Sequence, residues 1–443
     1  MSRTSLLQDL LSTLVDRRTW LPDSFLGGGP KTIEAICSAL MSTRGEASGT
    51  ALAARALEAF QDLDEDGQVA FFENLAADYD PDPERVRSTA NAYADDRSPE
   101  TLAALVAATE PPRQELLRRL NQAPGGTAAL VGMRESLLRH LRDKPHLRGL
   151  DADFIHMFSS WFNRGFLVMQ PIDWHTPADV LDKIIHYEAV HEIGTWEELR
   201  RRLKPADRRC FAFFHPSMPE EPLVFVEVAL TRDIPDSIQG LLAEDREVLP
   251  VERASTAVFY SISNCQVGLR GVSFGSFLIK QVAEDLKREA PAIKTFVTLS
   301  PVPGLAEYMR RRSADNPESA LAALSERVAS PEWQSDPDAQ EADRKQLLGI
   351  AAQYFLNAKR PDNQPLDPVA RFHLGNGAAL HQVNWLGDTS GKGYAQSAGI
   401  MVNYLYDLDR IELNHEAYAT DREVIASRKV RALLPSGEDL ELA

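Results

Sequence analysis

The stretch that decides the fold covers residues 257–304. It contains AVFYSIS at 257–263, RGVSFG at 270–275 and IKTFVTL at 293–299. The first and last segments are rich in β-branched and aromatic residues, which is typical of strands. Between them, apolar residues recur at helical spacing, so one face of a helix is expected to pack on both strands. That face comprises Gly275, Leu278, Ile279, Val282 and Leu286. The sequence therefore predicts a strand, a turn, a helix and a second strand in that order.

The turn before the expected helix is suited to an anionic ligand. Small residues let backbone amides approach a ligand closely, and a helix N-terminus favours negative charge, so a pyrophosphate fits here. The candidate binding residues are Arg270, Gly271, Val272, Ser273, Phe274, Gly275 and Ser276. Ser261 and Asn264, on the strand facing the turn, are further candidates, although a strand serine is more often bonded only to backbone. Lys280, Lys287 and Arg288 on the helix supply a basic patch or, alternatively, an ordinary solvated face.

Composition narrows the class of protein. The chain has 443 residues, enough for two or three domains, with 44% hydrophobic and 26% charged residues, as in soluble globular proteins. No apolar run approaches the ~20 residues that span a bilayer. The formal charge of −17 disfavours nucleic acids and anionic membranes as partners. The first 20 residues predict an amphipathic helix of a cytoplasmic protein, and the three widely spaced cysteines predict buried thiols.

The two parts of the chain differ in character. Residues 5–162 show helical periodicity almost throughout, interrupted by Pro- and Gly-containing turns. We interpret residues 1–165 as an all-α helical bundle domain for packing or oligomerisation. Later segments at 209–214 and 222–230 predict strands, so the chain as a whole is α+β and does not fit a doubly wound sheet. We interpret 166–443 as the catalytic domain, with a helical insertion near 306–367 and a strand contributed by 391–407.

One motif points elsewhere. Asp62, Asp64, Asp66, Gly67 and Glu73 satisfy the spacing of an EF-hand calcium loop. However, no second loop of this kind occurs, and the run that follows reads as a helix packing its phenylalanines. We therefore favour an acidic turn between helices and expect no metal site.

The turn at 270–275 resembles the acyl-CoA signature of the GNAT acetyltransferase superfamily, with serine in place of its first glycine. Taken with its surroundings and four further blocks, this turn makes the chain resemble the malonyl-CoA decarboxylase family. These blocks are FYSIS (259–263), GLRGVSFGSFLIK (268–280), TLSPVPG (298–304), ALHQVNWLGD (379–388) and QPIDWHTPA (170–178).

The resemblance implies a helical N-terminal domain followed by a GNAT-like α/β catalytic domain. It implies cofactor-free conversion of malonyl-CoA to acetyl-CoA and carbon dioxide, as part of fatty acid metabolism, by a homo-oligomer such as a tetramer. It places the catalytic serine at Ser300 and the catalytic histidine at His381. In other members the position of Ser273 can hold an acid, and the end of this sequence lacks an SKL-type signal, so a cytoplasmic form is expected.

The chemistry fits these residue types. Loss of carbon dioxide leaves an enolate that must be stabilised and then protonated. A histidine that titrates near neutrality can supply the proton, and a serine hydroxyl can hold the thioester or carboxylate oxygen. Three other histidines compete for the role: His373, His215 and His175. Two alternative functions stay open, a GNAT-type acyltransferase and a non-catalytic CoA-binding assembly module.

Overall fold

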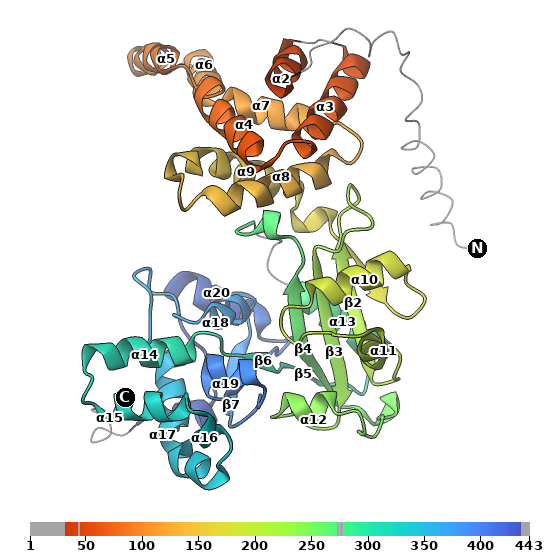
Figure 1. The fold of residues 1–443 in the computed structure, drawn as a ribbon, viewed down its shortest axis with the longest axis vertical. Helices are drawn as coiled ribbons and strands as arrows, with labels where there is room; N and C mark the ends of the chain where they lie inside the picture. The colour runs from red at the N-terminus through yellow and green to blue at the C-terminus, as the bar shows by residue number, and fades with distance from the viewer. Residues whose placement is uncertain (1–31, 43–44, 273, 275–277, 436–443) are drawn as a thin grey trace. The chain divides into compact units, whose positions relative to one another are not determined.

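The computed structural model describes residues 32–42, 45–272, 274 and 278–435. The chain divides into two compact units. One unit contains the chain up to Leu167 together with two later segments, His215–Pro219 and Gln266–Phe274. The other contains the remaining residues. The ribbon in Figure 1 shows that the first unit is helical and that the second is built on a sheet.

The helical unit has a phenylalanine core. Phe60 contacts Phe71 and Phe72 with ring centroids 5.5 and 5.6 Å apart, and all three are buried. Asp64 begins one helix by accepting a hydrogen bond from the Gly67 amide, as an N-cap should. The described helices of this unit are α2 (Ile33–Ser42), α3 (Glu46–Gln61), α4 (Glu65–Asp78), α5 (Pro83–Asp95), α6 (Pro99–Thr109), α7 (Pro112–Leu120), α8 (Gly126–His140), α9 (Arg148–Trp161) and the short 3-10 helices Pro145–Leu147, Arg164–Phe166 and Val267–Leu269.

The second unit contains an eight-stranded mixed sheet in the order β1-β2-β3-β4-β5-β8-β6, with β7 paired to β8. Neighbouring pairs from β1 to β4 are antiparallel, whereas β4 and β5 are parallel. The strands are β1 (Val168–Ile172), β2 (Arg208–Phe214), β3 (Val224–Thr231), β4 (Thr256–Asn264), β5 (Thr295–Thr298), β6 (Ser300–Pro301), β7 (Ala379–Asn384) and β8 (Met401–Leu405).

The parallel pair is joined by α13 (Leu278–Glu289), which buries Ile279, Val282 and Leu286. Pairing between β4 and β5 ends at Phe259 and Thr298. Beyond this point β4 continues to Asn264 beside β3, whereas the chain after β5 turns to pair with β8. The strands β4 and β5 therefore separate after this point. Ser300 lies on the side of β5, and the end of β4 lies on the other side.

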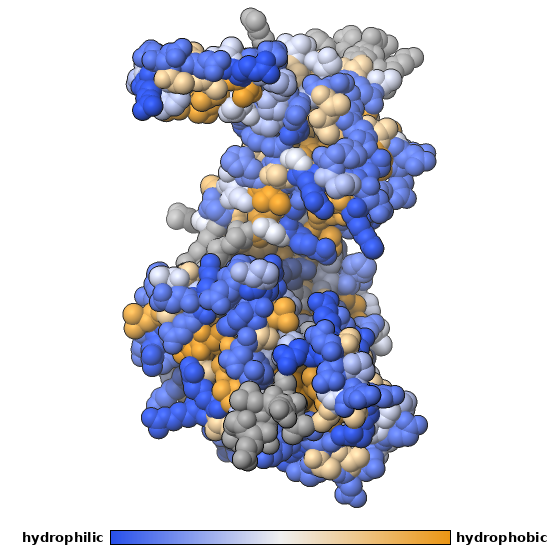
Figure 2. Space-filling view, turned by 90° about the vertical axis from the view of Figure 1, so that its left-hand side faces the viewer, coloured by the Kyte–Doolittle hydropathy of each residue, from blue (hydrophilic) through white to orange (hydrophobic). Residues whose placement is uncertain are grey.

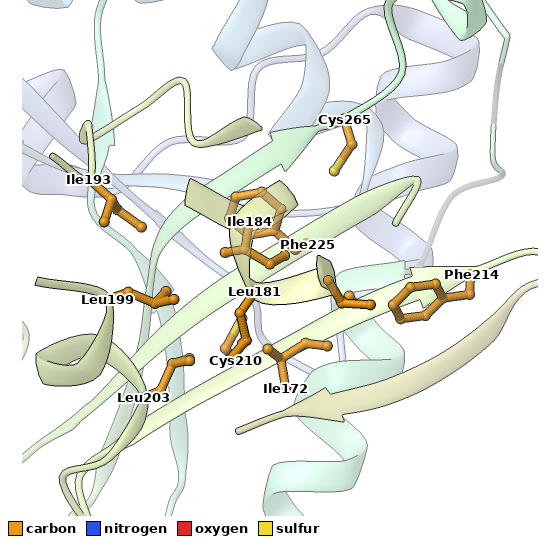
Figure 3. Packing of buried hydrophobic residues seen from close by; sticks show 12 residues of the cluster. Ile172, Leu181, Ile184, Ile193, Leu199, Leu203, Cys210, Phe214, Phe225 and Cys265 are labelled. Carbon is orange, nitrogen blue, oxygen red and sulfur yellow. The ribbon is translucent and has the colours of Figure 1, made fainter. Parts of the chain in front are cut away.

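Helices cover the sheet. Apolar side chains of α10 (Ala178–Tyr187) and α11 (Trp196–Leu203) meet those of β2 and β3, and Figure 3 shows them pointing toward one another. A second cluster joins α12 (Ile238–Leu242) to β4, β5 and β8. The other helices are α14 (Leu305–Asp315), α15 (Ala320–Val328), α16 (Pro331–Gln334), α17 (Pro337–Leu356), α18 (Pro368–Gly375), α19 (Gly391–Ser397), α20 (Ile411–Asp421), α21 (Arg428–Arg431) and the 3-10 helix Val251–Arg253. In Figure 2, hydrophilic residues cover most of the visible face, and hydrophobic residues form small patches.

The predicted fold class is confirmed, because a helical region precedes a mixed-sheet domain. The central strand, turn, helix and strand lie in the expected order, and α14 to α17 occupy the segment where we expected helices. Three strands were not predicted: β1, β6 and β7. The first 20 residues, for which we expected an amphipathic helix, lie outside the described residues. Within the described ranges, no helix is long and apolar enough to cross a membrane.

The acidic motif is a turn followed by a helix. α4 begins at Glu65, so Asp66, Gly67 and Glu73 are helical and do not follow the path of a calcium loop. The Glu73 carboxylate accepts hydrogen bonds from Lys144 at 2.7 Å and from His146 at 2.6 Å. The turn interpretation therefore agrees with the structure. The predicted buried thiols are also confirmed, since Cys37, Cys210 and Cys265 are all free and buried.

Candidate active site

Ser300 lies where the chain leaves β5 and enters β6. Its side chain is 6% exposed, and its hydroxyl donates to Thr298 Oγ1 over 2.9 Å. Thr298 Oγ1 also accepts from the Tyr404 amide of β8 at 3.1 Å. Two strands thus fix the threonine hydroxyl, which in turn orients the serine.

His373 is the histidine that the structure brings to Ser300. It lies in the last turn of α18, it is 3% exposed, and its Nε2 lies 3.2 Å from Ser300 Oγ. On the other side of the ring, Nδ1 lies 2.8 Å from the Tyr406 hydroxyl. The Tyr404 ring stacks on the imidazole, with centroids 4.5 Å apart and planes at 26°. Partners on both nitrogens and one face therefore hold the imidazole in a single orientation.

Burial controls the charge of this histidine. Removal from water disfavours the imidazolium form and lowers the pKa of His373 to about 3. At neutral pH the ring is neutral, so one nitrogen donates a hydrogen bond and the other accepts one. One consistent arrangement has Tyr406 donating to Nδ1, Nε2–H donating to Ser300 Oγ, and the Ser300 hydroxyl donating to Thr298. This arrangement forms a continuous chain of proton donors from Tyr406 to Ser300.

Amide side chains fix the strands behind the serine. Asn403 donates through Nδ2 to the Thr298 carbonyl at 2.7 Å, and its Oδ1 accepts from Asn384 at the same distance. Both asparagines are buried. Because buried amides that lose a partner carry a large desolvation cost, this network resists sliding of β8 past β5.

His381, which the resemblance indicates as the catalytic histidine, has different surroundings. It lies on β7 at a register shift between Leu380 and Gln382, and its backbone carbonyl accepts from the Ser427 hydroxyl at 2.6 Å. Its ring is half-buried near Lys429. Burial is the larger cause, and the positive charge of Lys429 the smaller, of a lowered pKa of His381. Among the hydrogen bonds of the described residues, none joins His381 to Ser300. Within the described residues, the structure thus brings His373, and not His381, within hydrogen-bonding distance of Ser300.

The other two competing histidines have different surroundings. His215 Nε2 lies 3.1 Å from the Trp161 carbonyl, and its Nδ1 accepts from the Ser217 amide at 3.1 Å. His175 is exposed. The sequence signal for His373 is weak: Asp367-Pro368 marks a helix start, but nothing local shows that a histidine in the last turn meets a serine 73 positions earlier.

The two strand candidates differ from each other. Ser261 is 1% exposed and donates to the Glu188 carboxylate at 2.6 Å, which gives the serine a structural partner. Asn264 is exposed at the end of β4, opposite Val224. The structure thus leaves Asn264 accessible and places Ser261 in a buried polar network.

Part of the predicted CoA-binding turn is anchored within the helical unit. The buried Arg134 of α8 donates to the Gly268 carbonyl at 2.6 Å, and a Cβ on Gly268 would lie 2.0 Å from the Val131 carbonyl. Gly271 has φ +82°, a conformation that favours glycine, and the space around it is open.

Two of the predicted pyrophosphate donors are already occupied. The amides of Arg270 and Val272 donate to Val267 and Leu269 carbonyls, both at 3.0 Å. Arg270 is exposed, Val272 is buried and Phe274 is partly buried. Ser273, Gly275 and Ser276 lie outside the described residues.

Two basic residues of α13, Lys280 and Arg288, have acidic partners. Lys280 lies 2.5 Å from Glu412, and Arg288 lies 2.5 Å from Asp285. Lys280, Lys287 and Arg288 line an open cavity of about 560 Å³ together with Glu284 and Asp409. This arrangement matches a solvated helix face better than a bare cationic patch.

Comparison with known proteins identifies the family. A family model described as the malonyl-CoA decarboxylase C-terminal domain matches residues 165–442, and one described as its N-terminal domain matches residues 79–162. The solved malonyl-CoA decarboxylases from Rhodopseudomonas palustris and Agrobacterium vitis are 53% and 54% identical to this chain, with TM-scores of 0.87 and 0.86. Each comparison covers 91% of this chain and 100% of the other. The mitochondrial malonyl-CoA decarboxylase of Anser anser anser is 36% identical over 348 residues, which are 72% of this chain and 69% of that protein. By these matches along nearly its whole described length, the chain belongs to the malonyl-CoA decarboxylase family.

Proposed function

We propose that this chain converts malonyl-CoA to acetyl-CoA and carbon dioxide, with Ser300 and His373 as its catalytic pair. The observation that carries the proposal is the contact between Ser300 Oγ and His373 Nε2, located where β4 and β5 separate in a member of this family. His373 replaces His381, the residue that the sequence alone indicated. The alternative functions, acyl transfer and non-catalytic CoA binding, gain no specific support from this geometry.

In the proposed reaction, the bond between the α-carbon and the carboxylate breaks, and its electron pair forms the enolate. Carbon dioxide leaves, and the α-carbon then takes a proton from the Ser300 hydroxyl. The serine oxygen recovers a proton from His373 Nε2, and Nδ1 takes one from Tyr406, which solvent reprotonates. One proton is consumed per turnover, and a neutral imidazole is sufficient for the relay, in agreement with the lowered pKa of His373.

The CoA portion of the substrate would meet the turn after β4. Of the residues predicted there, Arg270, Gly271, Val272 and Phe274 are described, and the open side of Gly271 supports close approach of a ligand. The exposed Asn264 at the end of β4 supports a further polar contact. Since two amides of this turn are already bonded within the chain, we expect the Arg270 guanidinium to supply a main contact to the pyrophosphate.

The decisive experiment compares His373→Asn with the matched control His381→Asn, using malonyl-CoA as substrate and acetyl-CoA formation as the readout. Loss of one general acid or relay group typically costs ~10²-fold or more in kcat. We expect such a loss for His373→Asn and for Ser300→Ala, with little change in CoA binding, and near-normal turnover for His381→Asn. The opposite result for the two histidines would restore the sequence-based assignment. Acylation of an added amine without decarboxylation would support a transferase.

We also propose a cytoplasmic homo-oligomer. Three free buried cysteines support a reducing compartment, and exposed Leu102 and Val106 on α6 offer apolar surface for a second copy. Sedimentation of the wild type against Val106→Asp tests the oligomer. An unchanged mass for the variant would exclude α6 from the contact.

A further inference from the structure

We propose that the Tyr354 hydroxyl sets the spacing between the two catalytic segments and is therefore a positioning residue for the pair. The inference rests on the proposed function, in which Ser300 and His373 act together. Tyr354 lies on α17, far in sequence from both residues, and it is 1% exposed. Its hydroxyl contacts the segment that follows Ser300 and also the segment that precedes His373.

The first contact is with Gly304, four residues after Ser300. A Cβ built on Gly304 would lie 2.2 Å from the Tyr354 hydroxyl oxygen, so the oxygen rests directly against the glycine backbone. Any side chain at this position would displace the tyrosine. The neighbouring Val302 and Leu305 are fully buried, so the backbone after Ser300 cannot move away to relieve such a contact.

The second contact is with Asp367, six residues before His373. The Tyr354 hydroxyl donates to Asp367 Oδ2 over 3.2 Å, and Asp367 Oδ1 accepts from the Ala370 amide at 2.8 Å. Asp367 is fully buried and is the N-cap of α18. The same carboxylate therefore begins the helix that carries His373 and fastens it to Tyr354, with His373 about 9 Å farther along the helix axis.

Through these contacts, the Tyr354 hydroxyl oxygen fixes the distance between Ser300 and His373. Without the hydroxyl, Asp367 loses a donor in a buried position, and the gap beside Gly304 lets α18 and the Ser300 segment shift relative to each other. A shift of about 1 Å in a catalytic group can cost up to roughly 10²-fold in rate. Because the hydroxyl is buried against Gly304 and Asp367, its effect should reach the reaction only through the distance between Ser300 and His373.

The test is Tyr354→Phe, which keeps the ring and removes the oxygen. We expect kcat to fall about 10- to 100-fold while KM changes little. In a Ser300→Ala background the same substitution should not lower the residual rate further, because the pair it positions is already broken. Tyr418→Phe is the matched control, since its hydroxyl is also buried on a helix packed against α18 but has no hydrogen-bond partner among the described residues. It should keep wild-type kcat.

A conservative variant separates positioning from loss of folding. Asp367→Asn retains an acceptor for Ala370 and a polar group facing Tyr354, so it should stay near wild-type kcat, whereas Asp367→Ala should behave like Tyr354→Phe. Wild-type kcat in Tyr354→Phe would overturn the inference, as would an equal loss of residual rate in the Ser300→Ala background. Full activity in Ser300→Ala or His373→Asn would instead refute the catalytic pair itself, whatever the result for Tyr354→Phe.

Discussion

Replacing Arg134 with methionine should destabilise the helical unit and disturb the turn that we propose for CoA binding. The arginine is 1% exposed. Its Nη1 donates to the Gly268 carbonyl at 2.6 Å, and its Nε donates to Asp151 at 2.8 Å. Methionine keeps an unbranched apolar stem, although a shorter one, and removes the charge and both hydrogen bonds, so the Asp151 carboxylate and a buried carbonyl lose their donor.

The expected magnitude follows from these two contacts. A hydrogen bond involving a charged group contributes about 1.5–3 kcal/mol, so losing two costs roughly 3–6 kcal/mol, similar to the cost of breaking other buried ion pairs. In a unit of this size, 1 kcal/mol corresponds to about 2–4 °C, so the loss of about 3–6 kcal/mol lowers Tm by roughly 6–24 °C. The carbonyl concerned lies two residues before Arg270. We therefore also expect KM for malonyl-CoA to rise more than kcat falls.

The assay is thermal and urea unfolding followed by circular dichroism, together with steady-state kinetics. Arg139→Met is the matched control, because Arg139 is exposed on the same helix. If Arg134→Met and Arg139→Met unfolded at the same temperature, the buried ion pair would not stabilise the unit as argued. If stability fell but KM stayed unchanged, the Gly268 anchor would be structural only.

Three further outcomes are expected. The acid limb of the kcat profile should lie well below pH 6.5, because burial lowers the pKa of His373 to about 3 and keeps the ring neutral; a limb at pH 6.5 would contradict this. Burial raises the pKa of Glu227 to about 7 despite its hydrogen bond from Arg202, so its protonated form adds stability that is complete below pH 4.5 and is lost as pH rises through 7. In urea unfolding at pH 5 and pH 8, the wild type should lose this stability and Glu227→Gln should not. An equal change in the free energy of unfolding between the two pH values for both proteins would refute the assignment. Calcium should not raise Tm, because the Glu73 carboxylate is occupied by Lys144 and His146; a saturable rise at micromolar calcium would show otherwise.

Local sequence determined the buried strands, because burial requires a recognisable pattern of apolar residues within the strand itself. The β-branched and aromatic residues at 257–263 and the alternation at 293–299 predicted β4 and β5, because a strand needs apolar residues on each face that it buries. The strand β1 was not predicted because it is a short edge strand, mostly exposed and containing Pro171. It is extended because it pairs with β2, and its own residues carry no strand pattern.

Sequence also indicated Ser300, through a motif that follows a predictable strand. It indicated His381, which lies in a recognisable block, and gave His373 only as a competitor, because a residue type does not reveal which side chains meet. The tertiary structure places the last turn of α18 against β6 and puts His381 at a register shift of β7, and our proposal of His373 rests on that placement. It likewise assigned Gln266–Phe274 to the helical unit, although the chain reaches this segment directly from β4. Contacts between residues 70 or more positions apart depend on how elements pack, and packing is a property of complementary surfaces that no single segment contains.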